Sequence, residues 1–301
     1  MSKLIGQYKN GNYNVSIYED GTKIRETIDD NAIDFIPEFS ESIDMKITNS
    51  CDMQCNFCHE NSIPNGKHAD INNLFGKAFL DSLHPYTEIA IGGGNPLEWP
   101  QLMFLLEELK KRNIIANMTI NQLHFMKNLD YIRMLLNDKL IHGIGISFHH
   151  IDNAFMDEFK TLDNGVLHII NGVANINEIK YLIKQNIKIL ILGYKICRRG
   201  ESNYDEHSKE IEVNKQMMRF ALPQLIQKSK VVSFDNLAIK QLDVQSLLSE
   251  DIWNEFYQGD DSSISFFLDL VERKYGKNST AIKRYHMLNS IDDMFTHIKN
   301  T

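Results

Sequence analysis

Cysteine is scarce in this chain, with four residues in 301. Long apolar runs are missing too: the first residues contain no apolar core of signal-peptide length, and no window approaches eighteen consecutive apolar residues. Few cysteines without an export signal indicate an intracellular protein whose thiols are reduced. We therefore expect a cytoplasmic protein that does not associate with membranes.

Basic residues are also outnumbered, with 32 Lys and Arg against 40 Asp and Glu. The formal net charge of -8 at pH 7 gives no general attraction to phosphate backbones and disfavours a nucleic-acid polymer as substrate. The chain has no Walker motif, no Ser-His-Asp arrangement and no low-complexity tract. Few rival chemistries are left to consider.

Three of the four cysteines, however, fall within eight positions: Cys51, Cys55 and Cys58. Three residues separate the first pair and two separate the second, directly after an alternating apolar run at 43–48. Cysteine thiolate is the usual ligand of iron-sulfur clusters, and a loop with this spacing can hold its three thiolates around one face of an iron-sulfur cube. One iron of such a cube keeps no protein ligand.

Three other interpretations compete with a cluster. Together with His59, the cysteines could form a Cys3His zinc site, but adjacent Cys58 and His59 suit one tetrahedral ion poorly. Residues 55–59 also spell the haem c attachment pattern, which needs export from the cytoplasm. A disulfide is disfavoured by the intracellular composition. The cluster remains the favoured hypothesis.

The triplet, with aromatic Phe57 just before the third cysteine, resembles the defining loop of the radical S-adenosylmethionine (radical SAM) enzymes. The resemblance implies that Cys51, Cys55 and Cys58 ligate a 4Fe-4S cluster, that the open iron chelates SAM, and that Phe57 packs near the adenine. It also implies reductive cleavage of SAM to a 5'-deoxyadenosyl radical that abstracts hydrogen, with an electron donor such as flavodoxin or ferredoxin. The cofactors would supply the reactivity, and the protein would supply binding and orientation.

Strand and helix patterns alternate from residue 43 onward, which predicts an α/β fold with a parallel sheet. Six strands, six helices and one further strand fit the partial (β/α)6 TIM barrel that the resemblance implies. The expected strands are 43–48, 88–92, 114–120, 143–148, 166–170, 187–194 and 231–234, and the expected helices are 73–84, 98–112, 127–138, 152–160, 177–185 and 206–228.

Two flanking regions complete the expected organisation. Residues 1–40 carry the turn signals Asn10-Gly11 and Asp20-Gly21 between short alternating runs, which predicts an antiparallel β meander. The barrel is expected over 41–235. In residues 236–301 strand and helix patterns no longer alternate. We expect these residues to form a mixed C-terminal extension that covers the barrel opening. The extension has no cysteine, so it cannot be an auxiliary-cluster domain.

A glycine run, Gly92, Gly93 and Gly94 followed by Asn95, ends the second expected strand. It resembles the family's GGE motif, which implies that these residues bind the methionyl end of SAM; glycine suits such a close backbone approach. Asn95 stands where many relatives have glutamate. Backbone carbonyls or the Asn95 side chain would then make the contact with the amine.

Further candidates follow the remaining strands, because reactive residues of a barrel sit at the carboxyl ends of its strands. Ser147 and Asn171 are expected SAM contacts, and Lys195 and Arg199 are expected to bind a carboxylate of SAM or of substrate. His149 and His150 are either substrate-binding residues or a hydrogen-bonded helix entry. Cys197 is either a hydrogen-atom donor or an unreactive half-buried thiol.

These observations predict a radical SAM enzyme that acts on a small molecule or a peptide. One alternative is an activating enzyme of the glycyl-radical type, which acts on a partner protein. The other is a non-catalytic iron-sulfur or SAM-binding protein, because a motif indicates capacity and not turnover.

Overall fold

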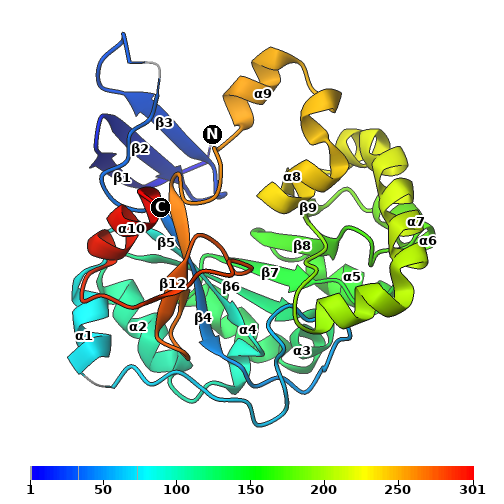
Figure 1. The fold of residues 1–301 in the computed structure, drawn as a ribbon, viewed down its shortest axis with the longest axis horizontal. Coiled ribbons are helices and arrows are strands. Elements are labelled where there is room, and N and C mark those ends of the chain that lie inside the picture. Colours follow the sequence, from blue (N-terminus) through cyan, green and yellow to red (C-terminus); the bar gives the residue numbers. More distant parts are fainter. Residues whose placement is uncertain (1, 33, 73) are drawn as a thin grey trace.

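A parallel sheet forms the centre of the computed structural model, which describes residues 2–32, 34–72 and 74–301. Its strands follow one another side by side in chain order (Figure 1), which confirms the predicted α/β fold and the seven strands after residue 40. They are β4 (Ser42–Thr48), β5 (Glu88–Gly93), β6 (Ile115–Asn121), β7 (Gly143–Ser147), β8 (Gly165–Ile170), β9 (Lys188–Leu192) and β10 (Val231–Phe234).

The connecting helices agree with the prediction in place but differ at several boundaries. The helices expected at 73–84 and 177–185 end earlier, at Asp81 and Leu182, and the one expected at 98–112 begins later, at Leu102. The helix expected at 127–138 is preceded by a short one, because Asn121 caps a turn that starts at Gln122. The helix expected at 206–228 matches the part of the last connecting helix that follows a kink at His207, and a further helical segment from Arg199 precedes the kink. Residue 73, the expected start of the first helix, lies outside the described residues. The helices are α1 (Leu74–Asp81), α2 (Leu102–Lys111), α3 (Gln122–Lys127), α4 (Leu129–Asn137), α5 (Asn153–Phe159), α6 (Ile176–Leu182) and α7 (Arg199–Lys228).

The C-terminal region extends the same sheet beyond β4. Strand β11 (Ser265–Asp269) pairs with β4 in parallel, and β12 (Lys274–Gly276) and β13 (Tyr285–His286) continue it in antiparallel fashion. The helices α8 (Asn236–Leu242), α9 (Glu250–Phe256) and α10 (Ile291–Lys299) complete this region. The apolar run at 264–268 is therefore largely strand, because its side chains are buried against the core.

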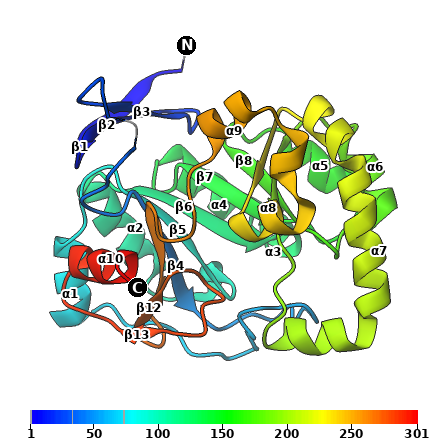
Figure 2. The ribbon, with the colours of Figure 1, turned by 45° about the horizontal axis from the view of Figure 1, so that its top comes forward.

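The barrel is partial, since β10 and β11 are not paired within the part of the chain that the structure describes. Side chains bridge these two ends of the parallel sheet instead. The Asn236 Nδ2 amide donates to Asp261 Oδ1 at 2.8 Å and to the Gly259 carbonyl at 3.3 Å. Figure 2 shows α7 along one flank of the sheet and α10 along the other.

The two faces of the sheet differ in character. Apolar residues such as Ile43, Met45 and Ile47 alternate with polar ones and pack with the helices into one core. The positions between them form what we call the inner face, which includes Asp44, Thr119, Ser147 and His168. Asp44 is exposed although β4 lies between two other strands. The inner face is therefore polar on β4, β6 and β7 and is reached by solvent at Asp44. Its positions on β8 and β9 beside His168 are apolar: Val166, Ile170, Leu190 and Leu192.

The predicted N-terminal meander is present as β1 (Leu4–Asn10), β2 (Tyr13–Tyr18) and β3 (Lys23–Thr27). It packs around Ile115 at the start of β6. Lys188 at the start of β9 donates to the Asp20 carbonyl at 3.4 Å. The meander thus lies at the amino ends of the strands, opposite the loops at their carboxyl ends (Figure 1).

The helices show no membrane span: across the described ranges, none combines the length and the apolar character needed to cross a bilayer.

Candidate active site

The cysteine loop leaves the carboxyl end of β4, because the apolar alternation of that strand stops at Thr48. Backbone hydrogen bonds close the loop: Cys51 N–H donates to the Ile63 carbonyl at 3.0 Å, and Cys58 N–H donates to the Cys55 carbonyl at 3.1 Å. Cys51, Cys55 and Cys58 are half-buried, and their thiols are free. The loop therefore presents three available thiols at one end of the sheet.

The glycine run lies directly against this loop. Gly94 N–H donates to the Thr48 carbonyl at 2.8 Å, and Asn95 N–H donates to the Ser50 carbonyl at 2.7 Å. A Cβ on Gly94 would lie 2.1 Å from the Ser50 oxygen, whereas a Cβ on Gly92 would meet no atom within 4 Å. Gly93 has a φ of +114°, which favours glycine. Gly94 is needed for the approach to the cysteine loop, and Gly92 faces open space.

Asn95 is turned inward and not toward that space. It is buried, its Nδ2 donates to Glu98 Oε1 at 3.2 Å, and its Oδ1 accepts from Leu97 N–H at 3.3 Å. Glu98 also accepts from the Ser50 hydroxyl at 2.5 Å. Sequence reasoning passed over Glu98, although it is the first carboxylate after the glycine run. In this structure Glu98 joins the glycine run to the start of the cysteine loop.

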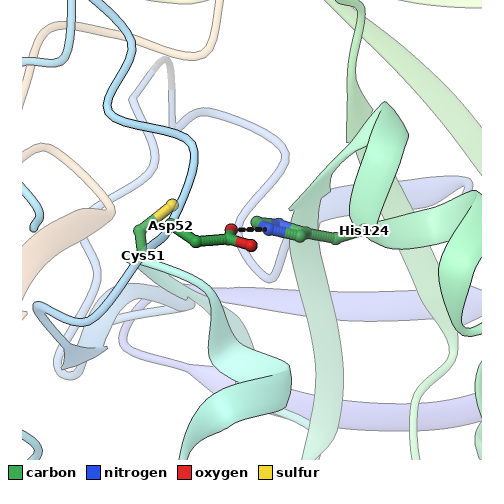
Figure 3. A group of neighbouring side chains, drawn as sticks. All are labelled: Cys51, Asp52 and His124. Carbon is green, nitrogen blue, oxygen red and sulfur yellow. Dashed lines mark hydrogen bonds and ion pairs between the residues drawn. The ribbon is translucent and has the colours of Figure 1, made fainter. Parts of the chain in front are cut away.

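A second tie reaches the loop from α3 (Figure 3). His124 is buried, and its Nε2 lies 2.6 Å from Asp52 Oδ1. Ligand atoms of Cys51, Asp52 and His124 lie within 4.8 Å of one another. The hydrogen bond from His124 holds the pKa of the Asp52 carboxyl below its usual value. Neither residue was among the sequence candidates, although Asp52 lies inside the triplet and His124 follows a strand end.

The predicted cationic residues at the end of β9 contact the cysteine loop. Lys195 Nζ lies 3.3 Å from His59 Nε2 and donates to Ser279 Oγ at 2.9 Å. Arg199 donates to the Ser62 carbonyl, and Arg198 to the His59 carbonyl. A Cβ on Gly200 would lie 3.4 Å from the Phe57 carbonyl oxygen. The start of α7 thus packs on the loop, so these cations have protein partners in this structure.

The other sequence candidates lie at several distinct places. Ser147 is half-buried at the end of β7. Asn171 is fully buried, with its Nδ2 on Gln241 and its Oδ1 without a hydrogen-bond partner among the described residues. His149 and His150 are exposed, and their backbone N–H groups donate to Gln122 Oε1, an arrangement that matches the helix-entry interpretation.

Cys197 is half-buried in the turn between β9 and α7. Burial raises the pKa of its thiol, although Arg198 and Lys195 act in the opposite direction. The thiol form is therefore favoured, as a hydrogen-atom donor or an inert residue would both require.

His168, in contrast, is an inner-face residue that the sequence did not single out. A Cβ on Gly145 would lie 2.4 Å from His168 Nε2 and 3.0 Å from Thr119 Oγ1. The imidazole therefore lies across β7 toward β6, and glycine at 145 makes room for it. Burial lowers the pKa of His168 to about 4, which keeps the ring neutral near pH 7. The single polar residue in an apolar strand was the available signal.

The residues present fit an iron-sulfur cluster. Burial raises the pKa of the Cys51 and Cys55 thiols, and the neighbouring cysteines raise both further. Bare thiolates are therefore unfavourable here, and bound metal supplies the positive charge that stabilises them. The loop offers three thiols, and the space over Gly92 lies beside it.

Comparisons with known proteins agree with this site. The family model of the Radical SAM superfamily matches residues 45–194, about half of the chain. No curated protein matches the chain. Among solved structures, Streptococcus suis SuiB bound to precursor peptide SuiA has a TM-score of 0.59 at 9% identity, covering 100% of this chain and 91% of that one.

Two further structures share the fold. SuiB bound to S-adenosylmethionine has a TM-score of 0.51 at 12% identity, covering 80% of this chain and 60% of that chain. Native anSMEcpe with bound AdoMet and Cp18Cys peptide has a TM-score of 0.51 at 13% identity, covering 86% and 79%.

The chain belongs to the radical SAM superfamily, and it is an enzyme of that superfamily. Its cofactors are a 4Fe-4S cluster and S-adenosylmethionine, with the CxxxCxxC triplet at 51–58 as the cluster motif.

Proposed function

We propose that this radical SAM enzyme modifies a peptide. The observation that carries the proposal is the position of the cysteine loop at the carboxyl end of a sheet whose inner face carries polar side chains and is reached by solvent at Asp44. The structures of SuiB and anSMEcpe that share this fold hold a peptide. The fold is thus compatible with a peptide beside the cysteine loop.

In this proposal, Cys51, Cys55 and Cys58 hold the cluster, and residues 92–95 lie along the methionyl end of SAM. Gly92 leaves the open space that a ligand would fill. Because the Asn95 side chain is engaged with Glu98, the amine contact falls to backbone carbonyls. Phe57, Ser147 and Asn171 remain proposed contacts of SAM, and Lys195 and Arg199 remain proposed contacts of a carboxylate.

Cys51, Cys55 and Cys58 would hold the cluster, which together with SAM would supply the one-electron chemistry that removes a hydrogen atom from the substrate and yields methionine and 5'-deoxyadenosine. The electron donor would be a small redox protein such as flavodoxin or ferredoxin. The chain itself binds the reactants, orients them and excludes competing partners of the radical.

The inner face would bind the peptide. His168 is neutral near pH 7 and Thr119 and Ser147 are uncharged, so this part of the face suits amide and hydroxyl groups. Asp44 adds a carboxylate on β4. Polar groups aimed at a peptide segment would fix which residue of the substrate lies nearest to SAM.

An anaerobic assay tests the proposal. The protein is reconstituted with iron and sulfide, mixed with SAM and dithionite, and assayed for 5'-deoxyadenosine, with Cys55→Ala as the control. We expect the wild type to form 5'-deoxyadenosine and the variant not to form it. Peptides present during the reaction are then examined for a mass change that depends on SAM.

Each other outcome has a defined meaning. A cluster that assembles without SAM cleavage, with or without added peptides, would favour the non-catalytic alternative. Activity that responds to a small molecule or to a partner protein, and not to peptides, would contradict the peptide assignment. Zinc retained in place of iron would refute the cluster itself.

A further inference from the structure

The end of the cysteine loop is joined to the C-terminal strands by buried charges. Glu60 follows Cys58 by two residues, and its Oε2 lies 2.8 Å from Lys46 Nζ on β4. The same ammonium lies 3.5 Å from Asp269 Oδ2 on β11. Arg284 Nη1 lies 3.3 Å from that carboxylate oxygen. The chain of contacts therefore runs from the cluster motif across two strands.

All four of these side chains are shielded from solvent. Glu60 and Lys46 are 5% and 7% exposed, Asp269 is 1% exposed and Arg284 is 12% exposed. Removing one member of a buried ion pair leaves the other charge uncompensated, which is strongly unfavourable. Glu60, Lys46 and Asp269 are thus mutually dependent, unlike the exposed pair Lys77 and Asp81.

A second connection runs in parallel. Lys195 contacts His59 at 3.3 Å and Ser279 at 2.9 Å, and His59 Nε2 lies 3.3 Å from Glu60 Oε1. The C-terminal region thus reaches both residues that follow Cys58, one through Lys46 and the other through Lys195. The His59–Glu60 contact joins the two links, so they hold this end of the loop together.

We propose that residues 265–286 are part of the cluster centre, with Asp269 acting through Lys46 and Glu60 as a positioning residue for the cysteine loop. This inference rests on the assignment of a cluster to that loop. The region lies beyond residues 45–194, which the superfamily model matches. Partners that orient ligating side chains typically change metal affinity about 10- to 100-fold when they are removed.

The test uses Asp269→Asn, which keeps the size of the side chain and removes its charge. Glu272→Gln is the matched control, because Glu272 is an exposed carboxylate in the turn that follows Asp269. Both are reconstituted anaerobically and measured for iron per chain, for the rate of cluster loss to an iron chelator and for the electron paramagnetic resonance spectrum of the reduced cluster. Thermal unfolding of the apo forms reports the fold.

We expect Asp269→Asn to lose its cluster to the chelator about tenfold faster than the wild type, with an altered spectrum, and Glu272→Gln to match the wild type. Equal cluster retention in Asp269→Asn and wild type would overturn the inference.

If Asp269→Asn unfolds the apo protein, the quadruple variant Lys46→Met, Glu60→Gln, Asp269→Asn, Arg284→Met takes its place, because it removes the charges of all four shielded side chains together. A folded quadruple variant with wild-type cluster retention would likewise overturn the inference, and a folded one that loses its cluster would support it. A wild type that binds no iron would contradict the cluster assignment itself. Failure of that assignment can thus be told apart from failure of the inference about Asp269.

Discussion

The imidazole of His124 lies 2.6 Å from the carboxylate of Asp52, across a sequence separation of 72 residues. This contact joins the residue beside the first cysteine to α3, the helix that follows the third strand of the barrel. A residue of a different βα unit, His124, thus helps to fix the backbone next to Cys51. The cysteine loop is therefore positioned by tertiary contacts at both ends, with Asp52 at one and Glu60 at the other.

Replacing His124 tests the first of these contacts. We expect His124→Ala to lower the free energy of unfolding by about 1 kcal/mol, because the hydrogen bond between the buried imidazole and the exposed Asp52 carboxylate is lost. The measurement is urea unfolding of the apo protein. His124→Gln keeps a donor and should recover part of the loss. An unchanged free energy of unfolding in His124→Ala would show that the contact contributes nothing.

The glycine run offers a matched pair of substitutions. Gly94→Ala places a methyl group 2.1 Å from the Ser50 carbonyl oxygen, so we expect a loss of about 1–3 kcal/mol in the free energy of unfolding. Gly92→Ala meets no atom within 4 Å and should fold normally, yet bind SAM more weakly if SAM occupies that space. Calorimetric titration of SAM into the reconstituted variants measures this, and unaltered affinity in Gly92→Ala would place SAM elsewhere.

His168 gives a prediction about pH. Burial lowers its pKa to about 4, against about 6.5 in an unfolded chain. Between these values the unfolded state binds the extra proton, so the free energy of unfolding falls as the pH drops from about 6.5 toward 4. His168→Phe should flatten this dependence in denaturant titrations at several pH values. A wild-type slope in the variant would assign the acid sensitivity to other groups.

The buried carboxylate of Glu41 forms ion pairs with Lys23 and Arg25 on β3, so it links the N-terminal meander to the rest of the chain. Burial acts to raise the pKa of this carboxyl, but hydrogen bonds from Arg25 and the charges of Lys23 and Arg25 outweigh it and hold the pKa below its usual value. The stabilisation is therefore present above the unfolded value of about 4.3 and is lost as the pH falls through the folded value.

Arg25→Met should remove most of this stabilisation. We expect a loss of about 1–3 kcal/mol at pH 7, because the fully buried Glu41 would lose its hydrogen bonds from Arg25 and keep only Lys23 as an ion-pair partner, and a smaller loss at pH 4. Urea unfolding at the two pH values measures the difference. Equal losses at both would mean that the charge of Glu41 does not hold the meander.

Local patterns in the sequence predicted much of the fold. The seven parallel strands, the meander and the position of the cysteine and glycine loops follow from alternation, turn residues and motif spacing, which are properties of neighbouring residues. The expected helix at 206–228 matches the part of α7 beyond its kink at His207. The part before the kink was missed, because its start is fixed by contacts of Arg198 and Arg199 with the cysteine loop and not by apolar periodicity. The residue limits expected for the meander (1–40), the barrel (41–235) and the C-terminal extension (236–301) stay a prediction.

The sequence by itself determined the class of site, since three cysteines at this spacing and a glycine run after the next strand are local features. Only the tertiary structure decided what holds that site. The partners of Asp52 and Glu60, His124 and the Lys46–Asp269 pair, lie in distant segments, and strand alternation does not reveal which strands become neighbours. Their contacts exist because the folded sheet places β11 beside β4 and α3 beside the cysteine loop.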